Sequence, residues 1–195
     1  MATHVEDVVG VLELEDLDDV VLCGHSYGGM PVTGAADQVA KRIRLIIYVD
    51  ALVPRDGESA FDLLPEQFSD MAQASAREHG EGWRVTIPIS LLPPEGWIAE
   101  DERVRYVSRL RDQPLATFAE PVRLTGALDG LPRAFVRCTG DDLGGDPIGP
   151  VAARAQAEGW LYRELVATHD PQLTAPAVTA AILHELVAAA PRRGD

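Results

Sequence analysis

The most constraining feature of the sequence is a glycine-flanked serine that stands between an apolar run and a segment of small residues. Residues 20–23 form a continuous apolar run, typical of a strand covered on both faces of a parallel sheet. The motif Gly24-His25-Ser26-Tyr27-Gly28 follows, and residues 27–40 show the pattern of a tightly packed helix. A serine at such a turn is expected to be strained, with the two glycines removing side chains that would collide. The motif predicts that Ser26 is a nucleophile at a helix N-terminus, where a developing anion is favoured.

Helical and strand patterns alternate along most of the chain. The expected elements are helices over 3–14 (with Thr3 as a cap), 150–158 and 175–190, and strands over 44–49, 134–138 and 160–166. This order predicts an α/β fold with a mostly parallel sheet flanked by helices. The alternation breaks down after Pro54 into proline-containing segments and short helical patterns. The sequence therefore predicts a core of residues 1–54 and 133–195, with a lid inserted at 55–132.

Charge and composition restrict the partners of the chain. Its 195 residues include 17 Lys and Arg against 31 Asp and Glu, a formal net charge of −14 that repels nucleic acids and anionic membranes. No apolar run approaches the roughly 20 residues that span a bilayer, and no signal-peptide pattern is visible, so a cytoplasmic protein is expected. Cys23 and Cys138 lack metal-ligand spacing and are expected to be buried, and no metal site is predicted.

A serine hydroxyl becomes a good nucleophile only when a base accepts its proton. His169 directly follows the last predicted strand, at the sheet edge where Ser26 also emerges, and is the predicted base. His25 and Tyr27 belong to the predicted oxyanion and substrate-binding turn. The backbone N–H of Tyr27 is the expected oxyanion donor, and the ring of His25 is expected to point away from the nucleophile.

The acid that orients the imidazole is expected on a loop between Ser26 and His169 in the chain. Asp142 is the first choice, because it follows the strand at 134–138 and leaves one strand before His169. Asp146 and Asp141 in the same loop remain alternatives, as does Asp50 at the end of the strand at 44–49.

At these residues the sequence resembles the α/β-hydrolase superfamily, and within it the esterase, methylesterase and hydroxynitrile lyase group. The similar stretches are residues 21–30, 48–54 and 168–170. The resemblance implies a small-molecule carboxylic ester as substrate, an acyl-serine intermediate, and no metal or organic cofactor. Hydroxynitrile lyases of this group carry a lysine directly after the catalytic histidine, where this chain has Asp170, so cyanohydrin chemistry is disfavoured.

The resemblance begins only at the helix before the motif. In the family, several strands and a His-Gly loop precede the nucleophile, so the sheet is expected to be incomplete, through a truncated start or a natural short form. An exposed sheet edge predicts a homodimer, and a missing oxyanion donor predicts weak activity. Two alternatives stay open beside the serine esterase: a non-catalytic or vestigial protein on the hydrolase scaffold, and a cofactor-free perhydrolase or haloperoxidase.

Overall fold

A four-stranded parallel sheet forms the centre of the protein. The computed structural model describes residues 1–86, 96–140 and 146–191. The strands lie in the order β1-β2-β5-β6, which is also the order in which these four strands occur along the chain. Their bounds are Val20–His25 for β1, Ile43–Val49 for β2, Arg133–Cys138 for β5 and Leu161–Leu165 for β6. The predicted α/β fold with a parallel sheet flanked by helices is confirmed.

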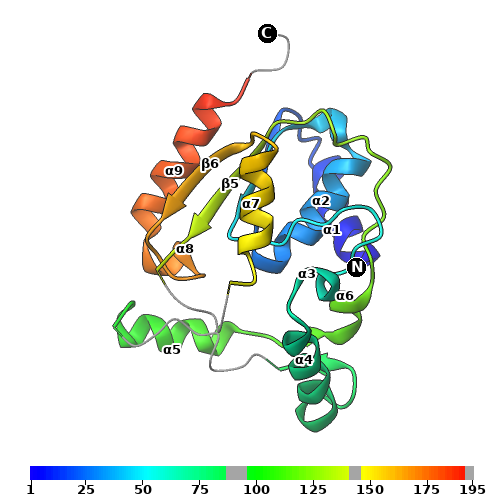
Figure 1. The fold of residues 1–195 in the computed structure, drawn as a ribbon, viewed down its shortest axis with the longest axis vertical. Helices are drawn as coiled ribbons and strands as arrows, with labels where there is room; N and C mark the ends of the chain where they lie inside the picture. Colours follow the sequence, from blue (N-terminus) through cyan, green and yellow to red (C-terminus); the bar gives the residue numbers. More distant parts are fainter. Residues whose placement is uncertain (87–95, 141–145, 192–195) are drawn as a thin grey trace.

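Helices pack on both faces of this sheet (Figure 1). On one face lie α1 (Ala2–Leu14), α2 (Gly29–Gln38) and α7 (Gly149–Ala157), and on the other lies α9 (Pro176–Ala189). Successive strand residues point to opposite faces, so Ile46 and Tyr48 join the first core cluster whereas Ile47 and Val49 join the second. This double coverage explains why β2 is apolar at almost every position.

The chain between β2 and β5 forms a group of short elements. They are α3 (Ala60–Leu63), α4 (Glu66–His79), β3 (Arg84–Val85), α5 (Glu100–Arg109), β4 (Gln113–Pro114) and α6 (Leu115–Ala119), with β3 and β4 paired antiparallel. In Figure 1 these helices gather at the end of the main sheet toward which β5 and β6 point. The action of this segment as a lid, and its boundaries at 55–132, stay predictions.

The chain that returns from α6 to β5 is fastened to α2 by a buried carboxylate. Asp37 accepts hydrogen bonds from the backbone N–H and the hydroxyl of Thr125, at 2.6 and 2.9 Å, and from the N–H of Leu128 at 3.2 Å. Val122 and Leu128 are buried, and Val122 belongs to the core cluster that contains α1 and α2. The stretch around Thr125 therefore packs with the core, although the sequence assigns it to the lid.

Several element limits differ from the sequence-based expectations. Strand β1 continues through Gly24 to His25, and α1 begins at Ala2 with no side-chain cap, so Thr3 does not cap it. The helix expected at 27–40 is divided into a 3-10 turn at Ser26–Gly28, α2, and a second 3-10 turn at Ala40–Arg42. Helix α8 (Pro171–Thr174), directly after the segment that carries His169, is missing from the expectations.

The expectation that Cys23 is buried is wrong, whereas Cys138 is buried as expected. Within the described ranges β1 pairs with β2 alone and forms one edge of the sheet. Cys23 shares a sheet face with Val21, and this is the face that α9 covers at the β6 side. The homodimer through this edge remains a prediction.

No helix in the part of the chain described here is long and apolar enough to cross a bilayer.

Candidate active site

Ser26 occupies the turn that leads from β1 into α2. Its φ of 53° lies in the left-handed region that residues with a side chain rarely adopt, so the strained conformation expected of this serine is confirmed. The Ser26 carbonyl accepts a hydrogen bond from the N–H of Leu52 at 3.0 Å, which ties the turn to the loop after β2. Ser26 is half-buried.

Two glycines allow this turn to pack closely, and only one of them, Gly24, belongs to the pair expected from the motif. A Cβ on Gly24 would lie 2.6 Å from a methyl group of Val32 and 2.9 Å from the carbonyl oxygen of Gly28. A Cβ on Gly28, in contrast, would meet nothing within 4 Å, so the collision expected at that position is absent. The tighter contact is at Gly29, where a Cβ would lie 2.0 Å from the carbonyl oxygen of Leu52.

His169 lies between Ser26 and a carboxylate. Its Nε2 is 2.7 Å from Ser26 Oγ, and its Nδ1 is 2.7 Å from Asp50 Oδ2. Each of these three side chains follows the carboxyl end of a strand: Ser26 follows β1, Asp50 follows β2, and His169 comes after β6. The parallel sheet thus brings together residues that are up to 143 positions apart.

Asp50 is held rigidly by its neighbours. It is 2% exposed, and its φ of 43° turns the chain sharply at the end of β2. While Oδ2 faces His169, Oδ1 accepts hydrogen bonds from Arg137 Nη1 and from the backbone N–H of Cys138, both at 3.0 Å. A carboxylate with these donors accepts from Nδ1–H of His169, which leaves Nε2 free of a proton and able to accept from the Ser26 hydroxyl.

The carboxylate beside His169 thus belongs to Asp50, which the sequence offers only as an alternative to Asp142. Asp142 and Asp141 lie outside the described residues. Asp146 is exposed, forms an ion pair with Arg137, and accepts a hydrogen bond from the N–H of Gly149 at 2.7 Å, so it caps the start of α7. The signal that could have favoured Asp50 is its position directly after the apolar strand Ile43–Val49.

His25 contacts the backbone and the ring of His169. Its Nε2 lies 2.6 Å from the backbone carbonyl oxygen of His169, and the two ring centroids are 4.9 Å apart. Burial lowers the pKa of His25, and the neighbouring His169 lowers it further. The ring of His25 therefore faces the loop that carries His169, and its assignment to substrate binding stays a prediction.

The side chain of Tyr27 points into the core. Its hydroxyl lies 2.9 Å from His4 Nδ1 and 3.3 Å from the carbonyl oxygen of Thr117, and its ring packs against Phe118 at 5.4 Å. Phe61 and Phe68 surround the same Phe118 ring, at 5.8 and 5.9 Å. An aromatic cluster of Tyr27, Phe61, Phe68 and Phe118 therefore begins directly beside the nucleophile. Any contribution of Tyr27 to an oxyanion site must come from its backbone.

Asp170 connects the histidine loop to α5. It is 7% exposed, and its Oδ1 accepts a hydrogen bond from Gln172 at 3.0 Å. Burial raises the pKa of Tyr106 on α5 to about 12, and the carboxylate of Asp170 contributes through its charge and by accepting the phenol's hydrogen bond. This contact joins a helix of the segment between β2 and β5 to the residue that follows His169.

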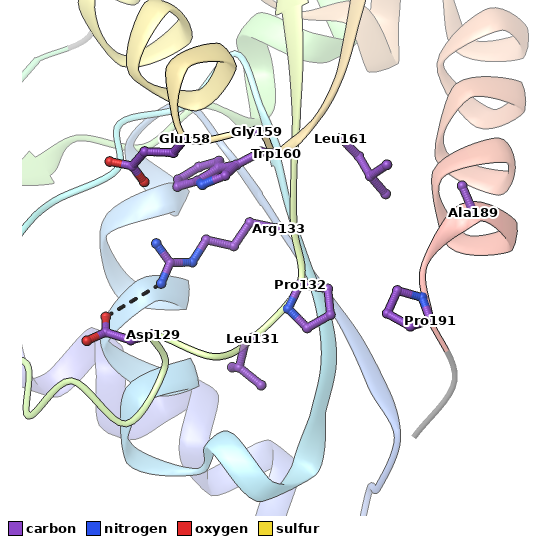
Figure 2. Close-up of a pocket in the computed structure, with 10 residues that line it drawn as sticks. All are labelled: Asp129, Leu131, Pro132, Arg133, Glu158, Gly159, Trp160, Leu161, Ala189 and Pro191. Carbon is purple, nitrogen blue, oxygen red and sulfur yellow. Dashed lines mark ion pairs between the residues drawn. The ribbon is translucent and has the colours of Figure 1, made fainter. Parts of the chain in front are cut away.

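A cavity of about 400 Å³ opens at the other end of the strands, where β5 and β6 begin (Figure 2). The guanidinium of Arg133 lies 5.1 Å from the centre of the Trp160 ring and 3.6 Å from a carboxylate oxygen of Asp129. Most of the lining residues stand before or at the start of β5 and β6, and the others lie at the end of α9, whereas Ser26, Asp50 and His169 follow the carboxyl ends of the strands. This cavity is therefore separate from the candidate site. Among the described residues, no cluster of three or more His, Cys, Asp or Glu side chains has the arrangement of a metal site.

Known proteins share both the sequence and the fold. The chain is 40% identical over 134 residues to a carbendazim hydrolyzing esterase of Nocardioides sp. (strain SG-4G), a match that covers 65% of this chain and 54% of that protein. It is 25% identical over 199 residues to the putative methylesterase 14, chloroplastic, of Arabidopsis thaliana, covering 92% of this chain and 55% of that protein. The chain spans about half the length of the curated relatives that it matches.

Solved structures support the same fold. An extracellular alpha/beta-hydrolase from a Paenibacillus species superimposes with a TM-score of 0.77 at 24% identity, covering 96% of this chain and 78% of that one. Residues 2–182 match the sequence profile of the alpha/beta hydrolase family, which includes all four strands of the main sheet and the three residues Ser26, Asp50 and His169. This match extends over most of the chain, and the chain therefore belongs to the alpha/beta hydrolase family.

Proposed function

We propose that this protein is a serine hydrolase that cleaves a neutral carboxylic ester through an acyl-serine intermediate, with Ser26 as nucleophile, His169 as base and Asp50 as the orienting acid. The observation that carries the proposal is the continuous pair of 2.7 Å contacts from Asp50 through His169 to Ser26. The order Ser, Asp, His along the chain is the order of this family's triads.

The geometry supports a two-step reaction. His169 Nε2 accepts the Ser26 proton while Oγ attacks the ester carbonyl carbon, and Asp50 stabilises the imidazolium that forms. The tetrahedral intermediate collapses as the protonated His169 gives its proton to the departing alcohol, which leaves the acyl group on Oγ. Water then attacks the acyl carbon with His169 again as base, so that the acid is released and Ser26 regains its proton.

The turn around Ser26 also supports oxyanion stabilisation. Tyr27 is the second residue of the 3-10 turn Ser26–Gly28, which continues directly into α2. Backbone N–H groups at the start of a helix point outward and carry partial positive charge. We assign the Tyr27 N–H as one donor to the carbonyl oxygen as that oxygen becomes negative.

The proposed substrate class is a neutral ester with an apolar or aromatic group. The aromatic cluster beside Ser26 offers apolar surface close to the nucleophile, through Tyr27 and Phe118. The formal net charge of −14 disfavours the approach of anions. Relatives named as esterase and methylesterase agree with an ester bond as the target.

The direct test combines labelling with turnover. Folded protein is incubated with a fluorophosphonate probe and assayed with p-nitrophenyl acetate, in parallel with Ser26→Ala. We expect labelling and hydrolysis in the wild-type protein and neither in Ser26→Ala. Ser69→Ala, which changes a half-buried serine on α4, is the matched control and is expected to behave like the wild type. Equal hydrolysis by Ser26→Ala would overturn the role of Ser26, whereas neither labelling nor hydrolysis in the wild type would favour a non-catalytic scaffold protein.

A further inference from the structure

The backbone of the base is bound by the residue directly before the nucleophile. His25 is the last residue of β1, and its Nε2 lies 2.6 Å from the carbonyl oxygen of His169. The next residue, Ser26, meets His169 Nε2 at 2.7 Å. Consecutive residues of the turn thus contact the two ends of His169, one at its backbone and one at its ring.

The charge state of His25 follows from this contact. A carbonyl oxygen only accepts hydrogen bonds, so Nε2 of His25 must carry the proton and donate. Burial lowers the pKa of His25, and the charge of His169 lowers it further, whereas Asp170 and Asp50 act in the opposite direction. His25 is accordingly a neutral donor while His169 gains and loses a proton in the reaction.

The flanks of the histidine loop are also anchored, but on the side of β5 and β6. The N–H of Gly140 donates to the carbonyl of Ala167 at 2.8 Å, and the hydroxyls of Thr168 and Thr174 lie 3.1 Å apart. The bond from His25 crosses the sheet edge from β1, the strand that also delivers the nucleophile. It therefore ties the backbone of the base directly to the strand that precedes the nucleophile, in addition to the path through Asp50 and the loop after β2.

We infer that His25 is a positioning residue, whose Nε2–H holds the His169 backbone so that the imidazole stays within hydrogen-bond distance of Ser26 Oγ. This inference rests on the proposed function, because it assigns His25 a part in the activation of Ser26. A displacement of about 1 Å between reacting groups can cost about a hundredfold in rate. The bond is therefore expected to affect the turnover step more than the binding of substrate.

Three substitutions separate positioning from packing. His25→Gln places an amide N–H where Nε2 stands, His25→Asn places its amide one bond short, and His25→Phe keeps a ring without a donor. Turnover of p-nitrophenyl acetate is measured per active site, with sites counted by fluorophosphonate labelling, and KM is measured alongside. We expect kcat to fall about 10- to 100-fold in His25→Phe and His25→Asn, with KM within about twofold, and to recover to within about fivefold of wild type in His25→Gln.

The outcomes distinguish this inference from the proposed function. Should Ser26→Ala hydrolyse the ester as fast as the wild type, the proposed function fails and the role of His25 falls with it. Should hydrolysis depend on Ser26 while His25→Phe and His25→Asn keep the wild-type kcat per labelled site, the positioning role alone is wrong. Equal losses in His25→Gln and His25→Asn would also overturn it, because the donor would then be irrelevant. If His25→Phe does not fold, the comparison of the Gln and Asn variants decides.

Discussion

Asp50 and His169 are 119 positions apart in the chain, and their side chains meet at 2.7 Å across the end of β5. Asp50 follows β2 and His169 comes after β6, with β5 between these two strands in the sheet. The intervening strand supplies donors instead of the acid: Arg137 and the backbone N–H of Cys138 bind the second oxygen of Asp50. The two donors thus orient the Asp50 carboxylate through Oδ1, and its other oxygen, Oδ2, faces the imidazole of His169.

This arrangement makes Asp50 the expected acid in turnover. Asp50→Asn keeps the shape of the side chain, and its amide oxygen can still accept from Arg137 and Cys138. The amide nitrogen would then face His169 and favour the tautomer with the proton on Nε2, which cannot accept the Ser26 proton. We expect kcat to fall by about 10²- to 10⁴-fold. Steady-state hydrolysis of p-nitrophenyl acetate measures the loss.

Two other asparagine substitutions serve as comparisons for Asp50→Asn. Asp146→Asn removes the exposed partner of Arg137 and leaves Asp50 in place, so turnover is expected to stay within about threefold of wild type. Asp142→Asn tests the acid favoured by the spacing of the motif. A larger loss in Asp142→Asn than in Asp50→Asn would mean that the acid is not the one beside His169 in the structure.

The sequence predicts most of the fold and two of the three residues brought together at the site. Apolar runs identify β1, β2 and the centre of β5, of which β2 and β5 are largely buried in the middle of the sheet, and the glycine-flanked serine identifies the turn. Asp50 is only an alternative to Asp142 in the sequence-based prediction, because residues after β2 and β5 reach the same end of the sheet and spacing cannot tell which carboxylate turns toward His169. The contact of His25 with the carbonyl of His169 could not be predicted, because a side-chain contact with a distant backbone group leaves no periodic pattern in the sequence.

At the turn of Ser26, the glycine that the packing requires is Gly29 and not Gly28, which the motif predicts. A Cβ at Gly29 would overlap the carbonyl oxygen of Leu52, whereas a Cβ at Gly28 would enter open space. We expect Gly29→Ala to lower the free energy of unfolding by more than about 2 kcal/mol, and Gly28→Ala to change it by less than about 0.5 kcal/mol. Urea denaturation of the two variants provides the comparison. Equal stability would show that the loop carrying Leu52 moves away at little cost.

Asp37 is expected to make the free energy of unfolding depend on pH in the acidic range. Burial raises the pKa of Asp37, but the hydrogen bonds from Thr125 and Leu128 outweigh burial and hold it below its usual range. The stabilisation is therefore present above the pKa of the unfolded chain and is lost as the pH falls through the folded pKa.

Asp37→Asn tests this dependence. We expect it to lower the free energy of unfolding at pH 7 by about 1–3 kcal/mol. The difference from the wild type should shrink as the pH falls below about 4, where Asp37 of the unfolded chain becomes protonated while the folded carboxyl, with its lowered pKa, still holds its charge. Urea denaturation at both pH values gives the two differences, and an identical difference at pH 7 and pH 3 would contradict the assignment.

Tyr106 and Asp170 are expected to restrain α5 near the histidine loop. Tyr106→Phe keeps the ring and removes the hydrogen bond to Asp170, so α5 should open locally more often. We expect amide hydrogen exchange in residues 100–109 to rise about 5- to 10-fold, with the strand amides unchanged. Val104→Ala, on the exposed side of the same helix, is the control. Equal exchange in Tyr106→Phe and Val104→Ala would show that the contact does not hold the helix.

The most direct test of the triad is to trap the acyl group on the chain. Protein mixed with p-nitrophenyl acetate is quenched in acid within the first turnover, and its mass is measured before and after peptide digestion. A serine nucleophile activated by His169 requires a gain of one acetyl group, located on the peptide that contains Ser26 and absent in Ser26→Ala. Ester hydrolysis with no acetyl group on Ser26, or with the group on another residue, would contradict the role of Ser26 as nucleophile.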